Sequence, residues 1–146
     1  MREFPYIQTS VFVDDRMPFG GNQLATYWDT DANSSLTQEE MQGMALEMNF
    51  SESTFLEKAT NKDCVSKVRI FTPAAEIPFA GHPTLGTAFV LKHKQILKPR
   101  MTTALLELGV GPIRVDYLDD DNVRMIQPKP IFEDPIKDSE KVVETI

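Results

Sequence analysis

The stretch EIPFAGHPTLGTAFVLKHK, residues 76–94, decides how this chain of 146 residues folds. Prolines before and within it exclude one continuous helix or strand, because proline lacks a backbone N–H and fixes φ. Pro83 suits the first position of a helix, where a missing N–H costs nothing. Residues 83–94 then carry apolar side chains around much of the circumference, and Gly86 and Ala88 are small enough for close approach. This pattern predicts a helix enclosed by a sheet.

Short strands are predicted on both sides of that central helix. Apolar and β-branched residues bounded by turn-forming residues are typical of strands. The ranges expected to be extended are 7–13, 23–28, 50–56, 65–71, 105–108, 113–117 and 123–126. Seven strands and two helices predict an α+β domain whose sheet is mostly antiparallel.

The second helix is predicted over residues 38–48. Thr37 and Glu40 have the spacing of a capping box. Asn49 is a plausible end, because asparagine tolerates the left-handed conformation that terminates helices. One face carries an apolar stripe, formed by Met41, Met44, Ala45 and Met48. We expect this stripe, together with Trp28, to belong to the core.

Composition excludes several classes of protein. The formal charge is −7, from 22 acidic and 15 basic residues, and no basic patch of the kind that nucleic-acid binders carry is visible. A single cysteine, Cys64, excludes an internal disulfide, and two histidines support a metal site poorly. Residues 1–10 do not resemble a signal peptide, and no apolar run has the length of a membrane span. We therefore expect a cytoplasmic protein with no nucleic-acid or membrane partner.

The most unusual candidate site is Gly81-His82-Pro83. Glycine lets the backbone approach a ligand closely, and the N–H groups of a first helical turn form a seat for a carboxylate. His82 at this position could donate a hydrogen bond or move a proton near neutral pH. The alternative is purely structural: a tight start to the helix, with His82 as its cap.

Two further segments contain candidate site residues. Ser51 and Glu52 follow the end of the helix predicted over residues 38–48 and begin a strand. A single carboxylate such as Glu52 can act as acid and base in turn when a partly apolar pocket raises its pKa; the alternative is a solvated glutamate. Gly20-Gly21-Asn22 could hold a polar ligand through flexible backbone and an amide, or could be a plain turn.

Taken together, four motifs in order resemble the phenazine-biosynthesis PhzF family. They are Pro18-Phe19-Gly20-Gly21-Asn22, residues 48–55 (MNFSESTF), residues 68–73 (VRIFTP) and residues 76–87 (EIPFAGHPTLGT). The resemblance runs from about residue 7 to 127. It implies one lobe of a diaminopimelate-epimerase-like fold, a curved sheet wrapped around a central helix at residues 83–94.

The resemblance also implies a site and a reaction. Glu52 would move a proton between carbon atoms of a small anionic, carboxylate-bearing metabolite. Asn22, Ser51, Gly81, His82 and Pro83 would bind that substrate, and neither a metal nor another cofactor is expected. Related epimerases use paired cysteines, but Ala80 stands where one of those thiols would lie. Gln23 replaces a proline that is usual in the family.

Length is the main departure from the family, whose members are roughly twice as long. We expect residues 1–127 to form the first lobe and residues 128–146 to form a linker towards a second lobe. That lobe would come from the same parent chain, a partner chain or a homodimer. Two readings stay open: a cofactor-independent isomerase, and a single-lobe binding or interaction protein that is inactive without the second lobe.

Overall fold

A computed structural model describes residues 4–14, 16–17, 19–28, 35–97, 100–119 and 122–130. This part of the chain forms eight strands and two helices. In order they are β1 (Tyr6–Val11), β2 (Asn22–Trp28), α1 (Gln38–Met48), β3 (Glu52–Glu57), β4 (Ser66–Phe71), β5 (Glu76–Ile77), α2 (Gly81–His93), β6 (Thr103–Leu108), β7 (Gly111–Tyr117) and β8 (Val123–Met125).

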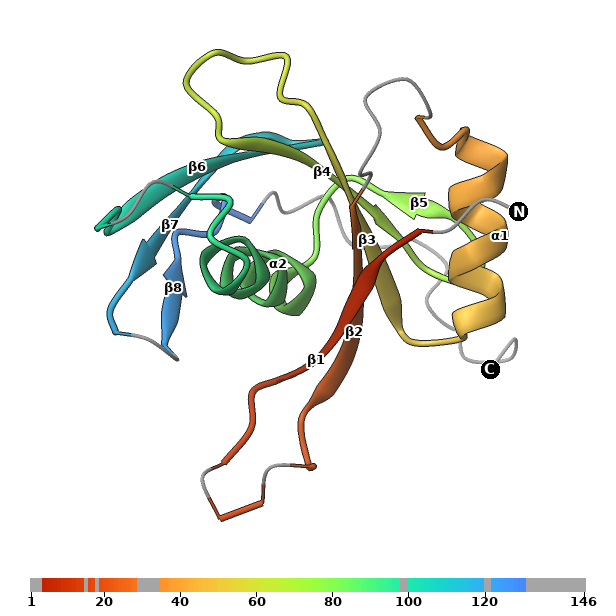
Figure 1. The fold of residues 1–146 in the computed structure, drawn as a ribbon, viewed down its shortest axis with the longest axis horizontal. Helices are drawn as coiled ribbons and strands as arrows, with labels where there is room; N and C mark the ends of the chain where they lie inside the picture. The colour runs from red at the N-terminus through yellow and green to blue at the C-terminus, as the bar shows by residue number, and fades with distance from the viewer. Residues whose placement is uncertain are drawn as a thin grey trace, which may run out of the picture.

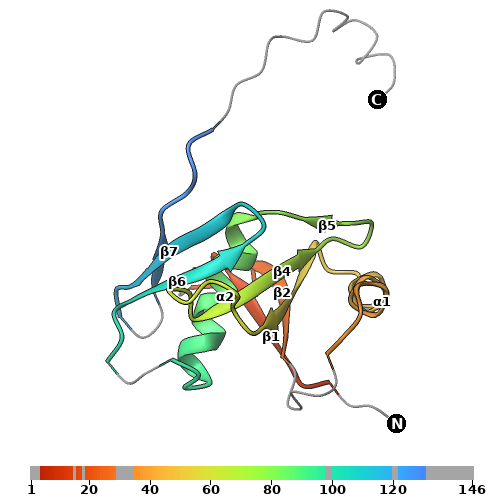
Figure 2. The ribbon, with the colours of Figure 1, turned by 90° about the horizontal axis from the view of Figure 1, so that it is seen from above.

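All eight strands belong to one sheet that curls around α2 (Figure 1). Its order is β1-β2-β3-β4-β6-β7-β8, with β5 paired to β4. The pairs β2–β3 and β4–β6 are parallel, and the other five pairs are antiparallel. Seen from above, α1 lies on the outer side of the sheet, away from α2 (Figure 2). The predicted α+β lobe with a curved, mostly antiparallel sheet around a central helix is therefore confirmed.

The central helix begins earlier than predicted. It starts at Gly81, and Ala80 is its N-cap with an extended backbone. The carbonyl of Ala80 accepts hydrogen bonds from the Thr84 N–H (3.4 Å) and the Thr84 hydroxyl (2.7 Å). Pro83 thus occupies the third helical position, where an N–H is still not needed. The prediction that placed Pro83 at the first position was wrong by two residues.

Two smaller predictions also need correction. The first strand ends at Val11, because Phe12 has a left-handed φ of 62° and cannot continue it to residue 13. The proline-rich segment before α2 contains a short strand, β5, because Thr72 closes a tight turn. Its hydroxyl accepts hydrogen bonds from the N–H groups of Ala74 and Ala75, which brings Glu76 opposite Phe71.

Helix α1 has the predicted bounds and caps. Thr37 and Glu40 form the reciprocal capping box, and Asn49 ends the helix with a φ of 54°. Met41 and Ala45 are buried in a cluster on the outer face of the sheet, and Met44 and Met48 pack against it partly buried. Trp28 is only half-buried, with Lys94 Nζ 5.3 Å from its ring centroid, so the prediction that it belongs to the core was too strong.

Helix α2 is buried along most of its length and contacts β1, β2, β3, β4 and β8. On one side its apolar residues join the main core cluster, which includes Ile70, Leu106 and Val115. On another side a chain of buried hydroxyls links it to the sheet: Thr87 donates to Thr54 (2.9 Å), and Thr54 donates to Thr26 (3.0 Å). A helix held on several sides cannot shift along its axis without breaking these contacts, which fixes the position of its N-terminus.

Gly86 lets α2 approach the first two strands. A Cβ at this position would lie 2.6 Å from Leu24 Cδ2 and 2.8 Å from Val11 Cγ2. Both distances are shorter than real carbon contacts, so a side chain here must displace Leu24 and Val11 or the strands that carry them. Gly43 in α1 is the opposite case, because a Cβ there meets nothing within 4 Å.

Replacing these two glycines by alanine should therefore change the free energy of unfolding by different amounts. Both changes gain helix propensity of about 1 kcal/mol, but Gly86→Ala also overpacks the helix–sheet contact by about 1–3 kcal/mol. Urea denaturation should show that Gly43→Ala raises the free energy of unfolding. The free energy of unfolding of Gly86→Ala should be about 1–3 kcal/mol lower than that of Gly43→Ala. Equal stabilisation by both substitutions would contradict the close packing at Gly86.

Candidate active site

Three elements meet at one end of α2 and bring the predicted site residues together. Asn22 begins β2, and Glu52 begins β3. These strands are parallel, with Leu24 opposite Glu52, so their first residues lie side by side at the same edge. His82 is the second residue of α2, and its side chain turns towards this edge of the sheet.

The side chains form a connected polar cluster, here called the Glu52–His82 cluster: Asn22, Ser51, Glu52 and His82. Asn22 Nδ2 lies 3.1 Å from His82 Nδ1, and the Ser51 hydroxyl donates to Asn22 Oδ1 at 2.9 Å. His82 Nδ1 is also 3.5 Å from Glu52 Oε2. Residues from three motifs, separated in sequence by 29 to 60 positions, thus share one small region.

Glu52 is not a fully solvated carboxylate. Its side chain is 18% exposed, and its Oε2 atom is buried with no hydrogen-bond partner among the described residues. A buried carboxylate oxygen without a donor is costly to leave unsatisfied. An unsatisfied group of this kind is also free to interact with a ligand, which is what an acid/base residue requires.

His82 does not cap the helix, since Ala80 is the N-cap and makes no side-chain capping bond. The imidazole is only 7% exposed, and its Nε2 lies 3.3 Å from the carbonyl oxygen of Gln23. Burial lowers the pKa of His82 below its usual range, while the Glu52 carboxylate and the Gln23 carbonyl act in the opposite direction. The structure therefore favours a neutral imidazole at this position.

Gly81 and Pro83 lie in the first turn of α2, the former half-buried and the latter buried. Because Ala80 offers no capping side chain, the positive end of the helix dipole favours negative charge here. The amide of Gln127 and the end of Met125 flank Gly81: a Cβ there would lie 3.6 Å from Gln127 Nε2 and 3.9 Å from Met125 Cε. Sequence reasoning did not single out Gln127. Its position after the last strand gave no sign that the chain returns to the start of α2.

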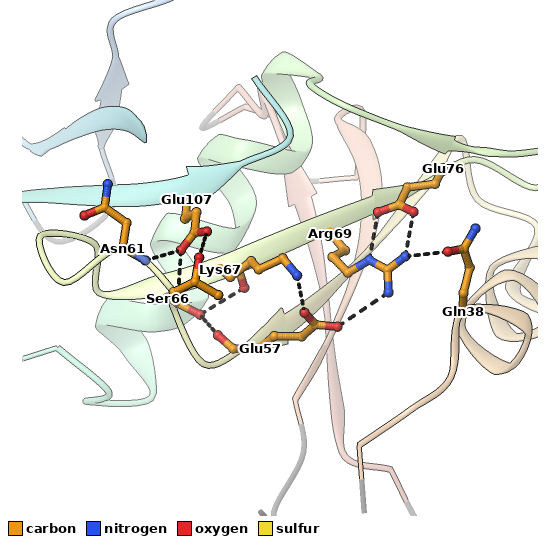
Figure 3. Close-up of polar contacts among 9 residues, drawn as sticks. Gln38, Glu57, Asn61, Ser66, Lys67, Arg69, Glu76 and Glu107 are labelled. Atoms are coloured by element: carbon orange, nitrogen blue, oxygen red, sulfur yellow. Dashed lines mark hydrogen bonds and ion pairs between the residues drawn. The ribbon is translucent and has the colours of Figure 1, made fainter. Parts of the chain in front are cut away.

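A second polar cluster lies on the outer face of the sheet, across β3, β4, β5 and β6 (Figure 3). Arg69 donates two hydrogen bonds to Glu76 (2.8 and 2.6 Å), and Lys67 pairs with Glu57 at 2.7 Å. Glu107 accepts hydrogen bonds from the backbone of Thr60 and Asn61. Lys67, Arg69, Glu76 and Glu107 border a groove of about 680 Å³. Because each of these charged groups is already held by an ion pair or by hydrogen bonds within the protein, we interpret this cluster as structural.

The described residues contain no group of three or more His, Cys, Asp or Glu side chains that could hold a metal ion. Within the same part of the chain, none of the helices has the length and apolar character needed to cross a membrane. Residues 128–130 are exposed and have no regular structure, and the rest of the predicted linker, residues 131–146, lies outside the described residues.

Comparison with known proteins identifies relatives. The chain is 39% identical over 135 residues to the trans-2,3-dihydro-3-hydroxyanthranilate isomerase of Pseudomonas aeruginosa, covering 88% of this chain and 44% of that protein. It is 43% identical over 111 residues to an uncharacterized isomerase, PM1503, of Pasteurella multocida, covering 76% and 36% respectively. The chain thus spans less than half the length of these relatives.

A solved structure shows the same architecture. A phenazine biosynthesis protein of the PhzF family from Enterococcus faecalis superimposes with a TM-score of 0.71 at 30% identity, covering 92% of this chain and 49% of that protein. Residues 9–145 match the PhzC-PhzF family, described as phenazine biosynthesis-like protein. The Glu52–His82 cluster lies within that match, and the chain belongs to the PhzC-PhzF family.

Proposed function

We propose that this chain carries the acid/base half of an isomerase site, and that Glu52 is its proton-transfer residue. The Glu52 carboxylate would take a proton from one carbon of a substrate and return a proton to another carbon. The substrate then changes in bond position and not in composition, and the enzyme ends in its starting state. No redox partner or second substrate is needed for such a step.

The observation that carries this proposal is the unsatisfied Oε2 of Glu52. It is buried and has no hydrogen-bond partner among the described residues, and the nearest ring nitrogen, His82 Nδ1, lies 3.5 Å away. A structural glutamate would be expected to have this oxygen paired, as Glu76 and Glu107 do. The relatives described as isomerases support the same reaction class.

For the substrate we propose a small metabolite that bears a carboxylate. The start of α2 supports this choice, because the first turn has no side-chain cap and its dipole attracts an anion. The Gln127 amide beside Gly81 is a further donor for the same group. In this arrangement Gly81, His82 and Pro83 form the seat of the carboxylate, and Glu52 lies next to it.

We also propose that the site needs a second lobe, provided in solution by a second copy of this chain. The hairpin between β1 and β2 projects from the sheet (Figure 1) and leads directly into Asn22. Four large apolar side chains on it are exposed: Phe12 (69%), Val13 (48%), Met17 (64%) and Phe19 (95%). A group of this kind favours association, and it stands beside the cluster that would need a second wall.

The proton-transfer role can be tested with trans-2,3-dihydro-3-hydroxyanthranilate as probe. In D₂O, the wild type should incorporate deuterium at substrate carbon, and Glu52→Gln should lower the rate by at least about 100-fold, because it removes the acid/base group. Glu57→Gln is the matched control, since Glu57 ends the same strand and pairs with Lys67 on the outer face. Unchanged exchange in Glu52→Gln would remove Glu52 from this role, and no exchange in the wild type would contradict the enzymatic proposal.

The association can be tested by light scattering. A chain of 16.5 kDa should show twice that mass at high concentration, and Phe19→Ser should shift it to the monomer by removing the most exposed apolar side chain of the hairpin. Leu46→Ser is the control, because Leu46 is 60% exposed on α1, outside the hairpin. A wild type that stays monomeric at every concentration would exclude the homodimer.

A further inference from the structure

We infer that Ser51 and Asn22 are positioning residues that hold His82 as the neutral Nε2–H tautomer and thereby keep Glu52 out of an ion pair. This differs from the expectation that both residues contact the substrate. The catalytic meaning of the inference rests on the proposed function, but the hydrogen-bond chain itself does not. These hydrogen bonds run from the Ser51 hydroxyl to the Asn22 amide and from the amide to the imidazole of His82. The donor and the acceptor of each bond follow from the Gln23 carbonyl on the far side of the ring.

The Nε2 atom of His82 must carry a hydrogen. It lies 3.3 Å from the carbonyl oxygen of Gln23, and a carbonyl oxygen can only accept a hydrogen bond. Since this acceptor belongs to the backbone of β2, it is present whatever the side chain at position 23. One ring nitrogen is thus fixed as a donor.

The Nδ1 atom of His82 is fixed as an acceptor. Asn22 Nδ2, which can only donate, lies 3.1 Å from it. A hydrogen on Nδ1 would put two donors face to face. The Gln23 carbonyl fixes this order from the other side of the ring, and the Ser51 hydroxyl completes it by donating to Asn22 Oδ1 at 2.9 Å. If the amide were turned over, Oδ1 would face Nδ1 and would favour a protonated, charged ring.

These hydrogen bonds decide whether Glu52 forms an ion pair with His82. Among the described residues, Glu52 is the charged group that acts on His82, and the groups that β2 contributes, the Asn22 amide and the Gln23 carbonyl, are neutral. A charged His82 would form an ion pair with Glu52 Oε2 across the present 3.5 Å. Such a pair would stabilise the carboxylate and weaken it as a base. Because Asn22 already satisfies Nδ1, Oε2 stays available for a substrate proton.

The inference is tested by ¹⁵N NMR of the whole chain labelled at histidine, without substrate. The chain has two histidines, and exposed His93 is an internal reference. At pH 7.5, His82 should show the Nε2–H pattern, and its titration midpoint should lie below the usual range for a histidine. Asn22→Asp replaces the donor by a carboxylate, so it should protonate Nδ1 and raise the His82 midpoint by about one pH unit or more.

Two further variants test the individual hydrogen bonds. Ser51→Ala removes the hydrogen bond that holds the Asn22 amide in place, which weakens its bond to Nδ1 and should raise the His82 midpoint in the same direction. Gln23→Ala keeps the backbone carbonyl and should leave both nitrogen shifts unchanged. A wild-type spectrum with a hydrogen on Nδ1 at pH 7.5 would overturn the inference even if no variant folds, as would an unchanged midpoint in a folded Asn22→Asp variant. The predicted tautomer in a protein without isomerase activity would contradict only the proposed function.

Discussion

The enclosure of α2 by a single curled sheet is the constraint on which the rest of the structure depends. The helix passes so close to β1 and β2 that only glycine fits at position 86 without displacement, and buried threonine hydroxyls tie it to β2 and β3. A helix packed on several sides has one position and one axial register. Its N-terminus, which carries His82, is therefore placed at the edge where β2 and β3 begin.

The parallel pairing of β2 and β3 provides the other half of the site. Antiparallel neighbours would put the start of one strand beside the end of the other, and Asn22 would then lie far from Glu52. The parallel register instead sets Leu24 opposite Glu52, so both strands present their first residues to the same end of α2. This arrangement requires a long connection between the two strands, and α1 forms part of that connection on the outer face of the sheet (Figure 2).

Much of the fold could be predicted because local sequence signals agreed with the final packing. The capping box at Thr37, the left-handed Asn49 and the apolar circumference of α2 are each set by residues close in sequence. The predicted strands were wrong where backbone conformation or a turn sets the boundary. Phe12 ends β1 by its left-handed φ, and Thr72 closes the turn that creates β5. The proximity of Gln127 to Gly81 was missed for a similar reason, since it follows from the path of the chain after β8.

The residues of the candidate site could be proposed from sequence, but which of them bond to one another and which stay open to a ligand could not. Residue type shows that an asparagine offers one donor and one acceptor, and only geometry shows which neighbours use them. Here both ends of the Asn22 amide are occupied by protein groups, while the Glu52 oxygen beside it is not. A buried carboxylate next to a histidine usually lowers its energy by pairing with a protonated ring. In the proposed function, a neutral amide that prevents this pairing would leave Glu52 both buried and unengaged, which is the state that proton transfer to and from carbon requires.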